Sequence, residues 1–376
     1  MPAFLRTVDT FQPEAKSLPG AYYFDETIFA LEREKVFAAD WICVGREEGI
    51  PEPGSFVLVE VAGESILVVR SEENRISAFY NLCRHRGSRL CRDGQGRLGD
   101  RIRCPYHAWT YDLEGALVLA PRMDEVAGFD PAAHGLHRVH AAAAGGLLFV
   151  SLAQDPKPFA QEVEPHFARF RPWGLADLKV RRRIDYEVAA NWKVVCENYS
   201  ECYHCASVHP AFSRRVHARS GRNDAYAGTL LGGHMELAAG TSSLTATGDL
   251  CGPVLGTIGG DDLARVYFYS LFPNLMVSLH PDYVMTHIIE PLSATRTRVR
   301  CEWLFAEGAA DGEDCDPDAA VALWDPVNRE DWEVCAGVQL GVGSRAYRPS
   351  PFSRAESLSQ AFNQQLLRAL GPDAPG

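Results

Sequence analysis

Two short segments of the chain each contain one cysteine and one histidine. They read Cys83-Arg84-His85 and Cys104-Pro105-Tyr106-His107, and residues 86–103 separate them. Thiolates and imidazoles are side chains that bind transition metals. A chain that brings these four side chains to one point must fold so that two loop tips face each other. The pattern therefore predicts one metal centre held between two loops.

The distribution of these ligands favours an iron–sulfur cluster over zinc. Two cysteines and two histidines also form a legitimate zinc site, so a zinc-stabilised protein without redox activity is the alternative. Zinc fingers, however, group their cysteines together and their histidines together, whereas here each segment supplies one of each. A Rieske [2Fe–2S] centre uses two thiolates on one iron and two imidazoles on the other. We therefore expect the two segments to bind such a cluster.

A second group of candidate ligands lies in residues 191–210, which read NWKVVCENYSECYHCASVHP. Asn191 is a typical N-cap, and a helix over 191–203 is expected after it. At 3.6 residues per turn, Glu197, Glu201 and His204 would share one face of this helix. Three cysteines that surround the motif are expected to be buried, inert thiols: Cys196, Cys202 and Cys205.

Two histidines and one carboxylate would complete a second iron site. His209 lies five residues beyond His204 and would point away from its helix face, so the helix is expected to end near residue 205. With an acid from elsewhere, the pair would form the facial triad of a non-heme Fe(II) oxygenase. The candidate acids are Asp325, Glu330 and Asp331, in LWDPVNREDWEVC. The alternative is a solvated polar surface without metal.

The order of strand and helix patterns predicts an α+β protein with two domains. Short β-branched runs separated by turn residues dominate residues 40–153 and indicate an antiparallel meander over 54–80. A Pro-containing segment at 154–165 is a plausible boundary. The helical segment 26–37 is expected to pack against the second domain. That domain should contain strands at 181–189, 264–271, 274–280, 283–290 and 297–305, and helices at about 327–340 and after a capping box that begins at Ser353.

The charge and the motifs of the chain restrict the partners and cofactors that it can bind. The chain has 37 basic and 49 acidic residues, a net charge of −12, which is the wrong sign for binding nucleic acid. No apolar run is long enough to span a membrane, and Arg6 and Asp9 interrupt any secretory signal, so we expect a cytoplasmic protein.

Residues 94–99 match GxGxxG, but they follow one ligand segment and precede the other, so no bound nicotinamide or flavin is implied. Electrons must then come from another protein.

Taken together, these motifs resemble the oxygenase component, or α subunit, of the Rieske non-heme iron oxygenases, over about residues 24–370. Glu201 stands where many ring-hydroxylating members have aspartate, and ENYxECYHCxxxHP looks like the branch of choline monooxygenase, carnitine oxygenase and the demethylases of glycine betaine and stachydrine. The resemblance implies a β-rich Rieske [2Fe–2S] domain over 40–155. It also implies a helix-grip catalytic domain with a large antiparallel sheet, formed by 1–39 and 156–376.

The resemblance also implies a role for each motif residue. Cys83 and Cys104 would bind one cluster iron, and His85 and His107 the other. The mononuclear Fe(II) would be bound by His204, His209 and Asp331. Family members are commonly homotrimers in which Glu201, as a catalytic residue, would bridge His204 to the cluster histidine of a neighbouring subunit.

The implied activity is that of a monooxygenase. It would use O₂, and electrons from an NAD(P)H-dependent flavin/iron–sulfur reductase, to hydroxylate or oxidatively N-demethylate a small quaternary ammonium compound resembling betaine, choline or carnitine. The alternatives are an aromatic-ring hydroxylase, such as a dioxygenase, or an aryl O-demethylase of the same family, and a pure electron carrier. Aromatic candidates for holding the cation are Tyr199, Tyr203, Tyr267, Phe268, Tyr269 and Phe272.

Overall fold

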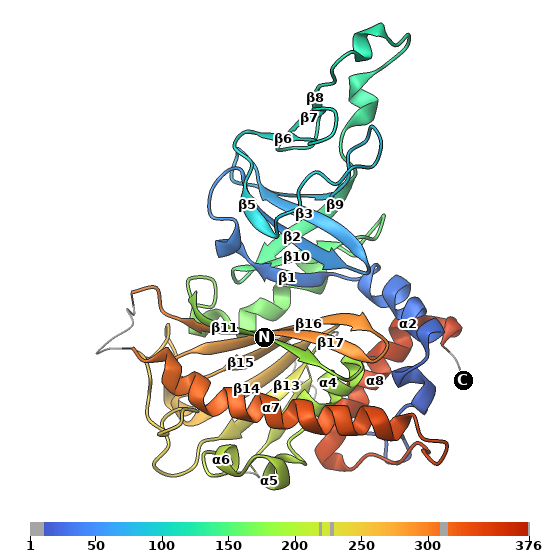
Figure 1. The fold of residues 1–376 in the computed structure, drawn as a ribbon. Helices are drawn as coiled ribbons and strands as arrows, with labels where there is room; N and C mark the ends of the chain where they lie inside the picture. Colours follow the sequence, from blue (N-terminus) through green and yellow to red (C-terminus); the bar gives the residue numbers. More distant parts are fainter. Residues whose placement is uncertain (1–10, 218–219, 226–228, 309–314, 375–376) are drawn as a thin grey trace. The chain divides into compact units, whose positions relative to one another are not determined.

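The computed structural model describes residues 11–217, 220–225, 229–308 and 315–374 (Figure 1). The chain divides into two compact units. One is formed by Phe37–Phe159, and the other by the described residues up to Val36 together with those from Ala160 onward. Each unit has its own antiparallel sheet, which confirms the predicted α+β class.

The unit of residues 37–159 is built mainly of strands. Its larger sheet has the order β1-β10-β9-β4-β3-β2-β5, and a small sheet has the order β6-β7-β8. Residues 62 and 63 join β2 to β3 with φ of 52° and 83°, the positive values that a type I′ hairpin turn requires. The predicted meander over 54–80 is thus confirmed. The strands are β1 (Ile42–Arg46), β2 (Ser55–Val61), β3 (Glu64–Arg70), β4 (Ile76–Tyr80), β5 (Gln95–Arg97), β6 (Arg101–Arg103), β7 (Thr110–Asp112), β8 (Leu117–Leu119), β9 (Arg138–Ala144) and β10 (Leu147–Ser151), with short helices η3 (Glu47–Gly49), η4 (Met123–Glu125) and η5 (Pro131–His134).

The two cysteine–histidine segments of this unit are loops at the ends of its strands. The first follows β4, and the second connects β6 to β7. The GxGxxG match lies around β5, which pairs with β2 and is followed by the strand β6 rather than by a helix. A nucleotide-binding fingerprint needs a helix N-terminus at that point.

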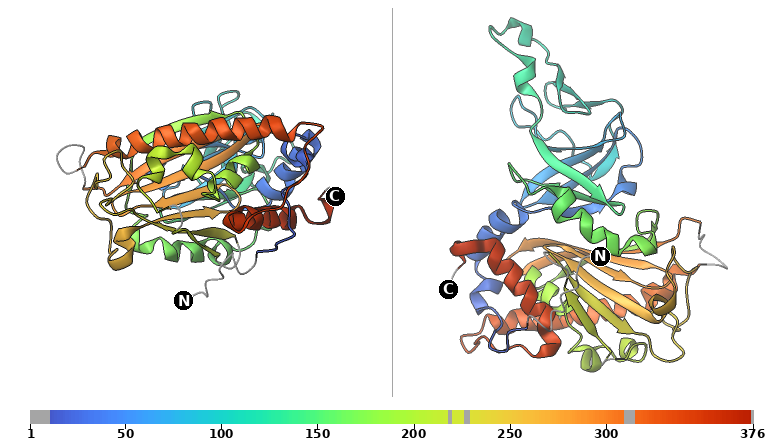
Figure 2. Two further views of the ribbon diagram at one scale, coloured as in Figure 1. Left: turned by 90° about the horizontal axis from the view of Figure 1, so that it is seen from below. Right: turned by 180° about the vertical axis from the view of Figure 1, so that it is seen from behind.

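The other unit is a seven-stranded antiparallel sheet with helices packed on it. The order is β11-β17-β16-β15-β14-β13-β12, and the long helix α7 runs along one face of the sheet (Figure 2). Among the described residues, no helix has the length and apolar composition needed to cross a membrane. The strands are β11 (Lys179–Val188), β12 (Arg222–Ala225), β13 (Leu230–Glu236), β14 (Arg265–Leu271), β15 (Leu275–Leu279), β16 (Val284–Ser293) and β17 (Arg296–Phe305).

The helices of this unit agree with the sequence only in part. The capping box at Ser353 is present, and the chain turns through η9 into α8, which has Gly371 as its C-cap. Helix α7 begins at Pro317, about ten residues before the expected start, and continues through Pro326. The helices are η1 (Gly20–Tyr23), α2 (Glu26–Glu32), η2 (Arg33–Phe37), α3 (Phe159–Glu162), η6 (Glu164–Arg169), η7 (Arg171–Trp173), α4 (Trp192–Tyr199), α5 (Cys205–Val208), α6 (Pro210–Ser213), η8 (Gly260–Ala264), α7 (Pro317–Val342), η9 (Arg354–Glu356), α8 (Ser357–Leu370) and η10 (Gly371–Asp373).

Candidate metal centres

The segment that contains the second group of ligands is less helical than its spacing suggested. Asn191 caps α4 as expected, but the helix ends at Tyr199, four residues before the predicted end. One carboxylate oxygen of Glu201 accepts hydrogen bonds from the backbone N–H groups of Tyr203 and His204. Such bonds from a side chain compete with the helical ladder. The prediction of one shared helix face was therefore wrong.

Glu197, the third member of the predicted face, takes no part in this arrangement. Its Oε1 accepts a hydrogen bond from the Tyr23 hydroxyl at 2.7 Å. Glu201 instead pairs with His204, with 2.6 Å between Oε1 and Nδ1. The turn after α4, rather than the helix itself, brings the glutamate and the histidine together.

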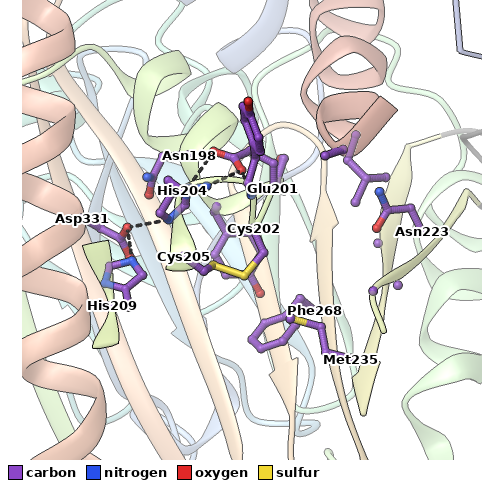
Figure 3. A pocket seen from close by; sticks show the side chains of 18 of the residues that line it. Asn198, Glu201, Cys202, His204, Cys205, His209, Asn223, Met235, Phe268 and Asp331 are labelled. Atoms are coloured by element: carbon purple, nitrogen blue, oxygen red, sulfur yellow. Dashed lines mark hydrogen bonds and ion pairs between the residues drawn. A yellow bond between two sulfur atoms is a disulfide. The ribbon is translucent and has the colours of Figure 1, made fainter. Parts of the chain in front are cut away.

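The two histidines converge on one acid of helix α7. The Nε2 atom of His209 lies 2.9 Å from Asp331 Oδ1, and the Nε2 atom of His204 lies 3.2 Å from the same oxygen (Figure 3). One ligand atom from each of these three residues lies within 4.8 Å of the others. Two imidazoles and a carboxylate at this spacing fit the donor set of a facial triad.

Neither of the other two candidate acids contacts both histidines at Nε2. Asp325 accepts a hydrogen bond from the Tyr186 hydroxyl at 2.8 Å and pairs with Arg329. Glu330 approaches the opposite edge of the His209 ring, with 2.7 Å between its Oε2 and Nδ1. Of the three acids considered from the sequence, Asp331 is the one that contacts both imidazole Nε2 atoms.

The charges at this site shift the proton affinities of its members. Burial alone would lower the pKa of His204, but hydrogen bonds to Asp331 and Glu201 outweigh it and raise the pKa to about 9. The pKa of His209 is also raised, against its burial, by Asp331 and Glu330. Burial works against ionisation of Asp331, but its hydrogen bonds to the two imidazoles keep its pKa below the ordinary value. A metal ion must therefore displace protons to bind here.

The two cysteine–histidine loops share one backbone design. In each loop, the N–H of the cysteine donates to the carbonyl oxygen five residues later, and the N–H four residues later donates to the carbonyl of the cysteine. The residue at that fourth position has positive φ, 68° at Gly87 and 58° at Ala108. The conformation costs an alanine about 1–2 kcal/mol, so the surrounding fold must hold this second loop in shape.

The side chains of these loops fit the expected cluster. Cys83 and Cys104 are each 2% exposed. The rings of His85 and His107 lie 4.7 Å apart between centroids, and His85 stacks on Trp109. The Nδ1 atom of His85 is buried without a hydrogen-bond partner among the described residues. Buried polar atoms normally have partners, so this nitrogen fits the ligand of a metal centre.

His204, His209 and Asp331 line a cavity of about 710 Å³. Three further rings line it next to one another: Phe212 and Trp324 lie 5.7 Å apart between centroids, and Phe268 lies 6.4 and 6.2 Å from them. These three residues are called the aromatic wall below. Figure 3 shows Glu201, His204, His209 and Asp331 gathered on one side of the pocket.

Strand register decides which of the predicted aromatic residues reach the cavity. Phe268 lines it, as do Tyr199 and Tyr203. The neighbours of Phe268 along β14 point to the opposite face of the sheet, where the Arg169 guanidinium lies 4.4 Å from the Tyr267 ring and 5.7 Å from the Tyr269 ring. The remaining candidate, Phe272, packs against Trp192 and Phe362.

Two members of the aromatic wall were missed at the sequence level, although a signal existed for both. Phe212 follows His209 by three residues. Trp324 precedes Asp331 by seven residues, two helical turns, and therefore lies on the same face of α7. Asn328 lies on that face as well and also lines the cavity. The spacing of Phe212 from His209 and of Trp324 from Asp331 was the signal that could have identified them.

The cysteines of the motif differ from the expectation of inert thiols. Cys202 and Cys205 form a disulfide, and both line the cavity (Figure 3). Cys196 is a buried free thiol, as expected. The residues between the disulfide partners are Tyr203 and His204, so the bridge closes a short loop around a candidate iron ligand. The spacing of two residues between cysteines could have indicated this pairing.

Family models match both units of the chain. Residues 40–130 match the Rieske [2Fe-2S] domain, and residues 175–371 match the ring hydroxylating alpha subunit (catalytic domain). The glycine betaine monooxygenase oxygenase subunit of Pseudomonas aeruginosa is 31% identical over 95% of this chain and 91% of its own length. The carnitine monooxygenase oxygenase subunit of Escherichia coli is 32% identical over 93% of this chain and 91% of its own length.

Solved structures show the same fold. A quaternary ammonium Rieske monooxygenase in complex with gamma-butyrobetaine has a TM-score of 0.77 and 26% identity, and the match covers 98% of this chain and 99% of that one. A naphthalene 1,2-dioxygenase from Rhodococcus, at 19% identity and covering 95% of both chains, has a TM-score of 0.77 and shares the fold. The chain therefore belongs to the Rieske oxygenase α subunits, with a Rieske [2Fe–2S] domain and a ring-hydroxylating catalytic domain that binds mononuclear iron.

Proposed function

We propose that this oxygenase acts on a small quaternary ammonium compound, which it hydroxylates or oxidatively N-demethylates. The observation that carries the proposal is the aromatic wall, which shares one cavity with His204, His209 and Asp331. Aromatic faces attract a quaternary cation by about 0.5–2 kcal/mol per contact, depending on desolvation. The glycine betaine and carnitine oxygenase subunits among the relatives support the same substrate class.

The proposed ligand sets follow the motifs. Cys83 and Cys104 would hold one cluster iron and His85 and His107 the other, while His204, His209 and Asp331 would hold the mononuclear iron. When bound, these centres would supply electrons and activate O₂ for hydroxylation of a C–H bond. A hydroxylated N-methyl group is a hemiaminal, which loses formaldehyde, so the net result is N-demethylation.

The side chains around the ligands have supporting roles in this proposal. Glu201 would keep the Nδ1–H of His204 engaged, which leaves Nε2 free for iron. The aromatic wall would exclude water from the reacting methyl group and hold the cation near the iron. Tyr199 lines the same cavity, and its hydroxyl is held 2.9 Å from the Ser278 hydroxyl.

The proposal includes partners and an assembly. Electrons would come from a separate NAD(P)H-dependent reductase. The chain would work in the cytoplasm as a homotrimer, in which Glu201 bridges His204 to the cluster histidine His107 of a neighbouring subunit. The domain limits that we propose are 40–155 for the Rieske domain, and 1–39 with 156–376 for the catalytic domain.

A substrate panel tests the proposal. Enzyme supplied with a reductase, NADH and O₂ is assayed for formaldehyde release from betaines and carnitine, and for turnover of aromatic acids. We expect turnover of the quaternary compounds, with release of formaldehyde where an N-methyl group is hydroxylated. In Phe268→Leu, the substrate Kd should rise about 2- to 30-fold through loss of one aromatic face. Tyr267→Phe, on the opposite face of the same strand, should leave the Kd unchanged. Turnover of aromatic acids alone would favour the ring hydroxylase or aryl O-demethylase.

A further inference from the structure

His209 is held by two acids that are adjacent in the sequence. Glu330 Oε2 lies 2.7 Å from its Nδ1 atom, and Asp331 Oδ1 lies 2.9 Å from its Nε2 atom. The imidazole itself is 2% exposed. The two ring nitrogens lie on opposite edges of the ring, so each carboxylate engages a different edge. The ring orientation is therefore fixed by hydrogen bonds at both ends.

The same arrangement surrounds the other histidine. His204 has Glu201 at Nδ1, at 2.6 Å, and Asp331 at Nε2, at 3.2 Å. Both imidazoles thus turn Nε2 toward the shared acid and Nδ1 toward a separate glutamate. A carboxylate on the far nitrogen of a ligating histidine fixes its tautomer and raises its basicity. Glu330 therefore contacts Nδ1 of His209 in the same way that Glu201 contacts Nδ1 of His204.

Helix geometry explains how one helix supplies both acids. Adjacent residues on a helix point about 100° apart, so one side chain can contact both only if it lies between their two directions. His209 occupies that position against α7, where α5 ends and α6 begins. Glu330 reaches the ring edge that faces away from the triad, so it is placed to orient the ligand and not to bind the metal.

An ordinary surface glutamate is the competing interpretation. The Glu330 side chain is 40% exposed, and most helix acids with such exposure are simply solvated. Its partner, however, is a nitrogen of a nearly fully buried ring. Among the described residues, Glu330 is the only hydrogen-bond partner of that nitrogen. A buried donor left without an acceptor costs about 1–3 kcal/mol.

We propose that Glu330 is a positioning residue for the mononuclear iron. It accepts the Nδ1–H of His209 and so presents the Nε2 lone pair to the metal in a fixed direction. This inference rests on the proposed ligand set and goes beyond it, because Glu330 touches neither iron nor substrate. It is independent of the substrate class, so a failure of the quaternary ammonium proposal would leave it standing.

Metal binding tests the proposal without turnover. Protein with an intact cluster is freed of mononuclear iron by chelation, and Fe(II) is titrated back without oxygen. The Fe(II) Kd should rise about 10- to 100-fold in Glu330→Ala. The rise should be smaller in Glu330→Gln, since the amide oxygen still accepts the Nδ1–H. Glu333→Ala, which removes an exposed acid from the same helix, should leave the Kd unchanged.

A spectroscopic signature separates positioning from general destabilisation. The EPR spectrum of the nitric oxide adduct of the mononuclear iron should change in Glu330→Ala and return toward the parent spectrum in Glu330→Gln. An unchanged Kd and spectrum in Glu330→Ala would overturn the proposal. Equal loss of iron in Glu330→Gln and Asp331→Ala would do so as well, because it would make Glu330 a ligand. If Asp331→Ala keeps its iron, the ligand set itself is wrong.

Discussion

Glu197 has an environment unlike that of the acids that contact His204 and His209. It lies on α4, four residues before Glu201, and accepts a hydrogen bond from the Tyr23 hydroxyl. Burial raises its pKa to about 7, although the bond from Tyr23 and the charge of Lys193 act in the opposite direction. A carboxyl group with this pKa changes its charge near neutral pH.

This shift predicts a pH dependence of stability. The folded-state pKa of about 7 exceeds the ordinary value of 4.5, so the folded protein keeps a proton that the unfolded chain has released. The contribution of Glu197 to the free energy of unfolding is therefore fully present below about pH 4.5 and is lost as the pH rises through about 7. Glu197→Gln removes this loss.

We therefore expect the melting temperature of Glu197→Gln, relative to the parent protein, to increase from pH 5 to pH 8. Thermal unfolding followed by circular dichroism across this range measures the difference. Glu333→Gln, an exposed substitution on α7, serves as the control and should follow the parent at every pH. A difference that stays constant or shrinks with rising pH would contradict the assignment of a raised pKa.

At the scale of elements, α2 and α4 are joined by a buried ion pair. Lys193 Nζ lies 2.6 Å from Glu32 Oε1, and both side chains are 0% exposed. The second carboxylate oxygen accepts a hydrogen bond from the Trp192 indole at 2.8 Å. The N-terminal helix is thus attached to the helix that leads into the ligand segment. This contact is the packing against the second domain that the sequence suggested for residues 26–37.

Replacing only one residue of this ion pair should lower the free energy of unfolding more than replacing both residues. Glu32→Gln removes the carboxylate that is hydrogen-bonded to the buried Lys193 ammonium, and we expect a loss of about 3–5 kcal/mol in the free energy of unfolding. Combining it with Lys193→Met should recover part of that loss, because no unpaired charge remains. Denaturant unfolding measures both variants. Glu290→Gln, which removes a more exposed pair with Arg298, should cost less than about 1 kcal/mol, and a similar cost for both single variants would refute the expectation.

Secondary structure near the ligands was predictable where a local signal existed. The N-cap of α4 and the capping box before α8 were both expected and both present. The end of α4 was not predicted, because backbone N–H groups that donate to the Glu201 carboxylate determine where the helix stops. The early start of α7 was also missed, although Asp316 caps that helix and Pro317 occupies its first turn.

At the scale of the whole molecule, each cysteine can be assigned either to a free thiol or to a disulfide. The chain has eleven cysteines, of which nine are free thiols and two form the bridge between Cys202 and Cys205. Every free thiol is buried. Only unfolding therefore exposes all of them to reagents.

A thiol titration tests this distribution. In denaturant without reductant, and after removal of iron, we expect nine reactive thiols per chain, rising to eleven after reduction. The variant Cys202→Ser with Cys205→Ser should give nine in both conditions, which assigns the difference to this pair. Eleven thiols in the unreduced parent protein would show that the bridge is absent in solution.

The sequence by itself determined the residue types and the spacing of both ligand groups, the antiparallel strands and the α+β class. These features depend on neighbouring residues and on the periods of strand and helix, which are local. The residue pattern left Asp325, Glu330 and Asp331 open, and the family resemblance pointed to Asp331. Only the tertiary structure decided that Asp331 meets both imidazole Nε2 atoms, that Glu330 contacts the other edge of the His209 ring, and which aromatic rings share their cavity. The physical reason is that more than a hundred residues separate His209 from α7, so their contact depends on how the sheet and its helices pack, and no local pattern encodes that packing.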